Sequence, residues 1–162
     1  MTALTLSTTG ERFIQGWERY EPKPYKDIVG IWTWGFGHAR KGQEPMPDYI
    51  SVADAQKLFD ADAAPFVKIA NRALTRVLNQ AQFDAFVSIL YNVGPGVPGL
   101  RDGIIVLASG KPSTLLSAIN AGDDAKVAIE WVKWCKAGGK QVQGLLNRRN
   151  AELAMYQGKK TS

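Results

Sequence analysis

Apolar side chains recur at the spacing of one helix face near the start of the chain. Thr8 or Thr9 can cap such a helix, and Glu11 lies in its first turn, where a negative charge is favourable. The pattern therefore predicts an amphipathic helix in this segment. Its apolar face consists of Phe13, Ile14, Trp17 and Tyr20.

Two prolines mark the end of this helix. Pro22 and Pro24 cannot continue a helix, and each disfavours helical backbone in the residue before it. We therefore expect the helix to end near Glu21 and the prolines to form a short connecting turn. Glu18 then lies in the last turn of the helix.

Residues 25–38 change to β-branched and aromatic residues punctuated by glycines, which predicts a β-hairpin followed by a glycine-rich strand. If residues 28–30 form a three-residue loop with Gly30 at positive φ, Asp27 pairs with residue 31 and residue 25 pairs with Thr33. Asp27 and Thr33 then share one face of the hairpin, whereas a two-residue loop would put them on opposite faces.

A loop is predicted over residues 42–49, and from Ser51 onward the chain is predicted to be mostly helical. A helix begins after Ser51, which resembles a cap, and Pro65 should break or kink it. The fold class is therefore α+β and mostly helical, with a small hairpin-containing N-terminal lobe and a larger helical C-terminal lobe. Further helices are expected near residues 80–92, 103–110, 112–121, 123–135 and 144–157.

The length of 162 residues suits a single domain. We expect the α+β lobe to span about residues 12–60 and the helical lobe about residues 61–162. Cys135 is the only cysteine, so no intrachain disulfide can form, and one histidine with one cysteine cannot build a His/Cys zinc site. No ligand spacing suggests a metal site built from carboxylates, so no metal and no cofactor are expected.

The net charge of +5 is unevenly distributed. Residues 133–162 carry seven lysines and arginines against the single acid Glu152. This excess is typical of a protein attracted to a polyanion such as cell wall, nucleic acid or a membrane surface. It is equally typical of a solvated helix face with a basic tail, and both interpretations stay open.

Two carboxylates are candidates for chemistry, because glycoside hydrolysis usually needs one protonated and one ionised carboxyl group. Glu18 and Asp27 lie on different elements that a short segment brings together. The helix end and the nearby charge of Glu21 favour a protonated Glu18, and we expect neighbouring aromatic residues to bury it partly. Asp27 needs a polar setting, in which the Thr33 hydroxyl could hold a water. Without further information, such a pair is more often a pair of solvated surface charges.

The spacing Glu18-x8-Asp27-x5-Thr33 occurs within ERYEPKPYKDIVGIWTWGFGH. This segment resembles the catalytic signature of phage-type lysozymes, the endolysins of glycoside hydrolase family 24. The positions that match the family pattern are Tyr25, Asp27, Gly30, Thr33, Gly35, Gly37 and His38.

The resemblance covers nearly the whole chain, because it continues through residues 55–66, 82–96 and 136–152. Arg19 departs from the pattern, since the family usually has glycine directly after the acid. The other departures are Pro22, Pro24 and Ala39.

The resemblance implies a lysozyme-like fold and hydrolysis of the β-1,4 bond between N-acetylmuramic acid and N-acetylglucosamine. It implies that Glu18 is the general acid, that Asp27 is the base or charge stabiliser, and that Thr33 positions the attacking water.

The resemblance also implies a set of substrate-binding residues. Tyr91 and Asn92 should line the sugar-binding cleft between the lobes, although packing at a helix end would explain them as well. His38 is included in this set, and we expect it to act as a structural hydrogen-bonding partner rather than as a proton shuttle. Three further residues at helical spacing are expected in the core: Trp131, Trp134 and Cys135.

The expected partner is bacterial peptidoglycan, bound by a monomer with no nucleic acid and no stable membrane insertion. The N-terminus lacks the features of a secretory signal, so we expect synthesis in the host cytoplasm and action on the wall after membrane permeabilisation. One alternative is a lytic transglycosylase, which needs no activated water and leaves an anhydro sugar. The other is a non-enzymatic module that binds the cell wall through its basic C-terminal segment.

Overall fold

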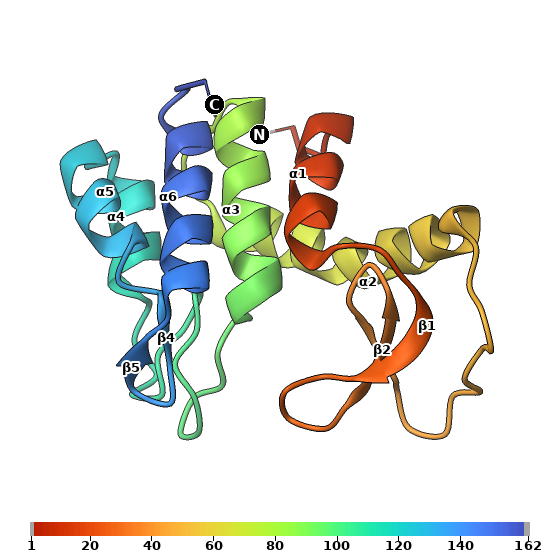
Figure 1. Ribbon diagram of the computed structural model, residues 1–162. Coiled ribbons are helices and arrows are strands. Elements are labelled where there is room, and N and C mark those ends of the chain that lie inside the picture. The colour runs from red at the N-terminus through yellow and green to blue at the C-terminus, as the bar shows by residue number, and fades with distance from the viewer. Residues whose placement is uncertain (1, 161–162) are drawn as a thin grey trace. The chain divides into compact units, whose positions relative to one another are not determined.

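The computed structural model describes residues 2–160, which form two compact units. The first unit comprises Glu11–Pro65. The second unit combines the described residues up to Gly10 with those from Phe66 onward. Figure 1 shows the helices and strands of both units.

Helix α1 spans Thr8–Glu18, so Glu18 lies in its last turn as predicted. The predicted cap is wrong by one residue. The Ser7 hydroxyl, rather than that of Thr8 or Thr9, accepts the Gly10 N–H at 3.1 Å. Ser7 is fixed there by Asp84, which accepts hydrogen bonds from both its hydroxyl and its N–H.

The helix ends earlier than predicted, because Arg19 turns the backbone at φ 62°. Among the described residues, Arg19 is the only one other than glycine with a positive φ. Its N–H still bonds to the Gln15 carbonyl at 2.8 Å, which closes the last turn of α1. The departure from the family pattern therefore falls at the position where the backbone itself favours glycine.

Replacing Arg19 by glycine is expected to raise the free energy of unfolding by about 1 kcal/mol, because a left-handed backbone costs any residue with a Cβ about that much. In thermal unfolding this corresponds to a Tm about 2–4 °C higher. Arg19→Ala is the matched control, since it removes the same side chain but keeps the strain. A glycine variant no more stable than the alanine variant would refute the explanation.

The first unit contains an antiparallel sheet in the order β1-β2-β3. Tyr25 lies opposite Thr33, and the Asp27 N–H bonds to the Ile31 carbonyl at 2.9 Å. Gly30 adopts φ 84°. The predicted three-residue loop and its register are therefore confirmed. The strands are β1 (Glu21–Lys26), β2 (Trp32–Gly35) and β3 (His38–Ala39).

The two prolines lie inside β1 rather than in the predicted turn. Pro22 and Pro24 are tolerated because β1 is an edge strand, where a missing N–H need not break a ladder bond. The Pro22 carbonyl accepts the Ile50 N–H at 2.8 Å, which ties the strand to the segment before the next helix. Thus β1 follows α1 almost directly.

Helix α2 spans Val52–Ala73, and Ser51 caps it as predicted by accepting the Asp54 N–H at 3.1 Å. Of the break or kink predicted at Pro65, the break is wrong, because the helix continues through Pro65, and the kink stays a prediction. Proline removes the bond to the carbonyl of Ala61, which is exposed, so water can satisfy that carbonyl. The core beneath the sheet consists of Trp34, Ile50 and Ala55, with Tyr20, Trp32, Phe36 and Leu58 packed around it.

In the second unit, helix α3 packs against helix α6, and α4 packs against α5 (Figure 1). Every residue from Phe83 to Leu90 in α3 is buried, so this helix forms the centre of the unit. The remaining elements are α3 (Gln80–Val93), α4 (Thr114–Ala121), α5 (Asp124–Trp131), β4 (Lys136–Ala137), β5 (Lys140–Gln141) and α6 (Gln143–Tyr156).

Two predictions for this unit are wrong. Residues 103–110 form turns and isolated bridges instead of a helix, because Gly96 and Gly103 pack backbone against backbone. A Cβ added to Gly103 would lie 1.9 Å from the Gly96 nitrogen. The helix predicted over 123–135 stops at Trp131, and a short β-hairpin follows it. No helix of the described residues is long and apolar enough to cross a membrane.

Candidate active site

Glu18 is the last residue of α1, and it is half-buried as predicted. The turn between β2 and β3 brings the Gly37 backbone against its side chain. A Cβ added to Gly37 would lie 2.9 Å from Glu18 Oε2 and 3.5 Å from Glu18 Cδ. Gly37 also has φ 76°, so both its conformation and its surroundings require glycine.

Asp27 is held by the loop that follows it. Its Oδ1 accepts the Val29 N–H at 3.0 Å and the Ile31 N–H at 2.8 Å. Its carbonyl accepts the Gly30 N–H at 3.0 Å. Both side-chain bonds use Oδ1, so Oδ2 remains able to accept a hydrogen bond from a water or a substrate.

Thr33 lies on β2, where its side chain is buried. The observed register places it on the same face of the hairpin as Asp27. Its hydroxyl donates to the Ile31 carbonyl at 3.2 Å, and a hydroxyl that donates in this way still has lone pairs that can accept. A water held between Thr33 and Asp27 stays a prediction.

The charges of both candidate carboxylates affect the Tyr25 phenol. Burial raises the pKa of its phenol, and the charges of Glu21, Glu18 and Asp27 raise it further. The Tyr25 hydroxyl therefore stays protonated at neutral pH and lies within electrostatic reach of both Glu18 and Asp27. In the sequence, Tyr25 matches the family pattern and is also one of the aromatic residues expected to bury Glu18.

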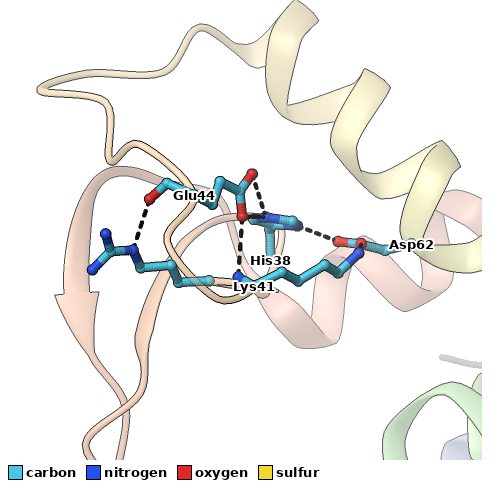
Figure 2. A network of polar contacts seen from close by, with 5 residues as sticks. His38, Lys41, Glu44 and Asp62 are labelled. Atoms are coloured by element: carbon cyan, nitrogen blue, oxygen red, sulfur yellow. Dashed lines mark hydrogen bonds and ion pairs between the residues drawn. The ribbon is translucent and has the colours of Figure 1, made fainter.

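His38 lies between two carboxylates (Figure 2). It is buried, with only 4% of its surface exposed. Its Nδ1 lies 2.6 Å from Asp62 Oδ2, and its Nε2 lies 2.9 Å from Glu44 Oε2. Lys41 adds an ion pair to Asp62 at 2.7 Å. Each ring nitrogen of His38 therefore has a carboxylate partner. This arrangement supports the structural role expected for His38, whereas contact with substrate stays a prediction.

Acid should weaken this network. The hydrogen bond from His38 lowers the pKa of Glu44, so the folded state binds that proton less readily than the unfolded chain. The stabilisation is therefore present above the usual glutamate pKa of about 4.3 and is lost as the pH falls through the lower folded value. We expect Glu44→Gln to lower Tm near neutral pH and to reduce the further loss of Tm on acidification.

Thermal unfolding of both proteins between about pH 6 and about pH 3 measures this difference. Asp54→Asn is the control, because the pKa of Asp54 is also lowered, chiefly by Lys57, yet both side chains are exposed and solvent screens their pair. A Glu44→Gln protein whose Tm falls as steeply as that of the wild type would contradict the assignment.

In the second unit, Tyr91 and Asn92 lie at the end of α3. The half-buried Tyr91 ring packs edge-on against Phe66, with centroids 5.3 Å apart. Asn92 is exposed, and its Oδ1 accepts a hydrogen bond from Arg149 Nη2 at 2.8 Å. Asn92 also lines a pocket of about 470 Å³, together with Val93, Asp102, Lys133, Trp134, Lys136 and Leu145.

The three residues expected in the core differ in their positions. Trp131 and Cys135 are buried, as predicted. Trp134 is only half-buried and forms part of the pocket wall, so its assignment to the core is wrong. Helical spacing does not apply to it, since α5 ends at Trp131. Within residues 2–160, no group of three or more His, Cys, Asp or Glu side chains could hold a metal ion.

The sequence model of the phage lysozyme family matches residues 15–152. The chain belongs to the phage lysozyme family. The resemblance drawn from the Glu18, Asp27 and Thr33 spacing is therefore confirmed at the level of the family.

Individual relatives agree with this family assignment. An endolysin of Bacillus phage B103 is 36% identical over 155 residues, which cover 94% of this chain and 54% of the relative. The chain thus spans about half the length of that relative. An endolysin of Acyrthosiphon pisum secondary endosymbiont phage 1 is 30% identical over 156 residues, covering 94% of this chain and 97% of the relative.

A solved structure supports the fold. The endolysin from Escherichia coli O157:H7 phage FAHEc1 has a TM-score of 0.79 and 31% sequence identity, and the match covers 96% of this chain and 94% of that one. The predicted lysozyme-like α+β fold, mostly helical, is confirmed.

Proposed function

We propose that this phage lysozyme family member hydrolyses bacterial peptidoglycan at the β-1,4 bond between N-acetylmuramic acid and N-acetylglucosamine. Family membership supports a peptidoglycan-cutting glycoside hydrolase. The observation that carries the mechanism is the placement of two carboxyl groups in the first unit: Glu18 ends α1 against the turn between β2 and β3, and Asp27 directly follows β1 of the same sheet. Two carboxyl groups near one point are what glycoside hydrolysis requires.

Glu18 is the proposed general acid. Its half-buried carboxyl lies against the Gly37 backbone, which restricts water on that side. In its protonated form it donates to the leaving glycosidic oxygen as the bond to the anomeric carbon breaks.

Asp27 and Thr33 are proposed to activate and position the attacking water. The loop bonds fix Asp27 through Oδ1, which leaves Oδ2 to accept a proton from the attacking water. The Thr33 hydroxyl, on the same face of the hairpin, accepts a hydrogen bond from the second O–H of that water, which stays on the oxygen. The water oxygen then bonds to the anomeric carbon, and the product carries a free reducing end.

The wider setting is proposed with this activity. The chain acts as a monomer on the cell wall, with Tyr91, Asn92 and His38 as candidate substrate-binding residues and no cofactor. It is made in the host cytoplasm and reaches the wall after the membrane is permeabilised. An endolysin relative of similar length, 30% identical to this chain, supports action on the cell wall.

Product analysis tests the proposal. Purified chain is incubated with peptidoglycan, and the fragments are reduced with borohydride and weighed by mass spectrometry. Fragments that end in reducible N-acetylmuramic acid support hydrolysis. Anhydro ends would instead identify a lytic transglycosylase, and binding without release of fragments would identify a wall-binding module.

A further inference from the structure

A buried guanidinium lies behind the pocket at the end of α3. Arg149 belongs to α6, and its side chain is 0% exposed. It reaches two parts of the pocket wall: its Nη2 lies 2.8 Å from Asn92 Oδ1, and its Nη1 lies 3.3 Å from the Trp134 carbonyl. All of these residues belong to the second unit.

The guanidinium is itself fixed in place. Glu152 Oε1 accepts from Arg149 Nη2 at 3.0 Å, and Glu152 Oε2 lies 2.8 Å from Arg149 Nε. The same carboxylate accepts from the Ser88 hydroxyl at 2.7 Å and from Trp131 Nε1 at 3.3 Å. Arg149 therefore has little freedom to move away from Asn92.

This contact decides which way the Asn92 amide faces. A guanidinium has only donors, so only the oxygen of the amide can face Arg149. The Asn92 Nδ2 group, with its two N–H donors, must then point the other way. Asn92 is exposed and lines the pocket, so these donors are available to a bound molecule.

We propose that Arg149 is a positioning residue for substrate binding: it holds the Asn92 amide so that its N–H donors meet an oxygen acceptor of the wall polymer. This inference rests on the proposed function. The acceptor is a carbonyl or a carboxylate, since these are the groups that a neutral N–H donor bonds best.

Of these two acceptors, the charges around the pocket favour a carboxylate over a carbonyl. Lys136 is exposed on the pocket wall, and Lys133 adds a second cation, although Glu130 pairs with it at 2.6 Å. Asp102 opposes them, but its Oδ1 accepts the Ala108 N–H at 2.7 Å. An acetamido carbonyl of the sugars and a carboxyl of the stem peptide share the required chemistry.

Asn92→Asp tests the direction of the amide. Aspartate keeps an oxygen for Arg149, loses the N–H donors and gains a negative charge that the Arg149 guanidinium stabilises, so the protein should be at least as stable as the wild type. With soluble glycan strands as substrate, we expect KM to rise about tenfold, the effect of one lost hydrogen bond, with kcat almost unchanged. An unchanged KM would overturn the proposal, because a merely structural Asn92 tolerates this change.

Arg149→Lys tests the positioning. Lysine keeps the buried positive charge but lacks the planar fork that spans Glu152 and Asn92. We expect KM to rise, and we expect Asn92→Asp to add little in this background, since the amide is already unoriented. Effects on KM that simply multiply would show that Arg149 does not act through Asn92.

Ser88→Ala is the matched control for lost stability. It removes a bond to Glu152 from the same network without touching Asn92, so it should lower Tm but leave KM unchanged. A raised KM in this variant would mean that general loosening, rather than the Asn92 amide, sets the affinity, and would contradict the proposal.

The choice of ligand shows whether the acceptor lies on the sugars or on the stem peptide, and the activity of the wild type tests the proposed function independently. Strands with intact stem peptides and strands stripped of them are compared: an Asn92→Asp effect only with peptides places the acceptor on the peptide, and an equal effect places it on the sugars. Calorimetric binding in a Glu18→Gln background repeats the comparison without cleavage. A wild type that cleaves nothing refutes the proposed function, whereas an active wild type with an unaffected Asn92→Asp variant refutes this inference alone.

Discussion

Glu18→Gln is expected to slow peptidoglycan cleavage by about 10³-fold, which is within the range that a positioned general acid contributes. Glutamine keeps the size and the hydrogen-bonding ability of the side chain but has no proton to give to the leaving oxygen. The rate is measured as reducing ends released from purified wall. The fold is checked by circular dichroism and Tm.

Glu21→Gln is the control for this experiment. Glu21 is an exposed carboxylate on β1 whose charge also raises the pKa of the Tyr25 phenol, so Glu21→Gln makes the same chemical replacement three positions from Glu18 and removes a nearby charge. We expect most of the activity to remain. Equal losses in the two variants would indicate that local charge, rather than proton donation by Glu18, is what cleavage needs.

The part of the site that the sequence predicted correctly depends on neighbours along the chain. The length of the loop and the left-handed Gly30 set the register that puts Asp27 and Thr33 on one face of the hairpin. The prediction that Glu18 lies in the last turn of α1 is likewise confirmed, although Arg19 rather than the prolines ends the helix. Local geometry decides both, so one sequence was enough.

The rest depends on partners that are distant in the sequence. The cap of α1 shifts to Ser7 because Asp84, 77 positions away, holds it. Arg149 orients Asn92 across 57 positions. In neither pair does spacing or residue type indicate the partner, since serines and surface amides have many possible roles. Packing alone brings these side chains together. Packing of the Gly96 and Gly103 backbones is also the reason that residues 103–110 do not form the predicted helix.

Gly37→Ala is expected to reduce cleavage by about 10²-fold, since displacing a catalytic group by about 1 Å costs that much. The new Cβ would lie 2.9 Å from Glu18 Oε2, which is too close for either atom to stay in place. The carboxyl end of a glutamate moves more easily than a turn of backbone, so Glu18 should move. The loss should appear in kcat, because the acid no longer meets the leaving oxygen.

Gly30→Ala separates this displacement from backbone strain. Gly30 has φ 84°, close to the 76° of Gly37, yet a Cβ there would meet nothing within 4 Å. Both variants should therefore lose about 1 kcal/mol of stability from the left-handed conformation. Only Gly37→Ala should lose most of its kcat. If the two variants lose stability and activity alike, the contact between Gly37 and Glu18 does not position the acid, and strain in the hairpin explains the effect instead.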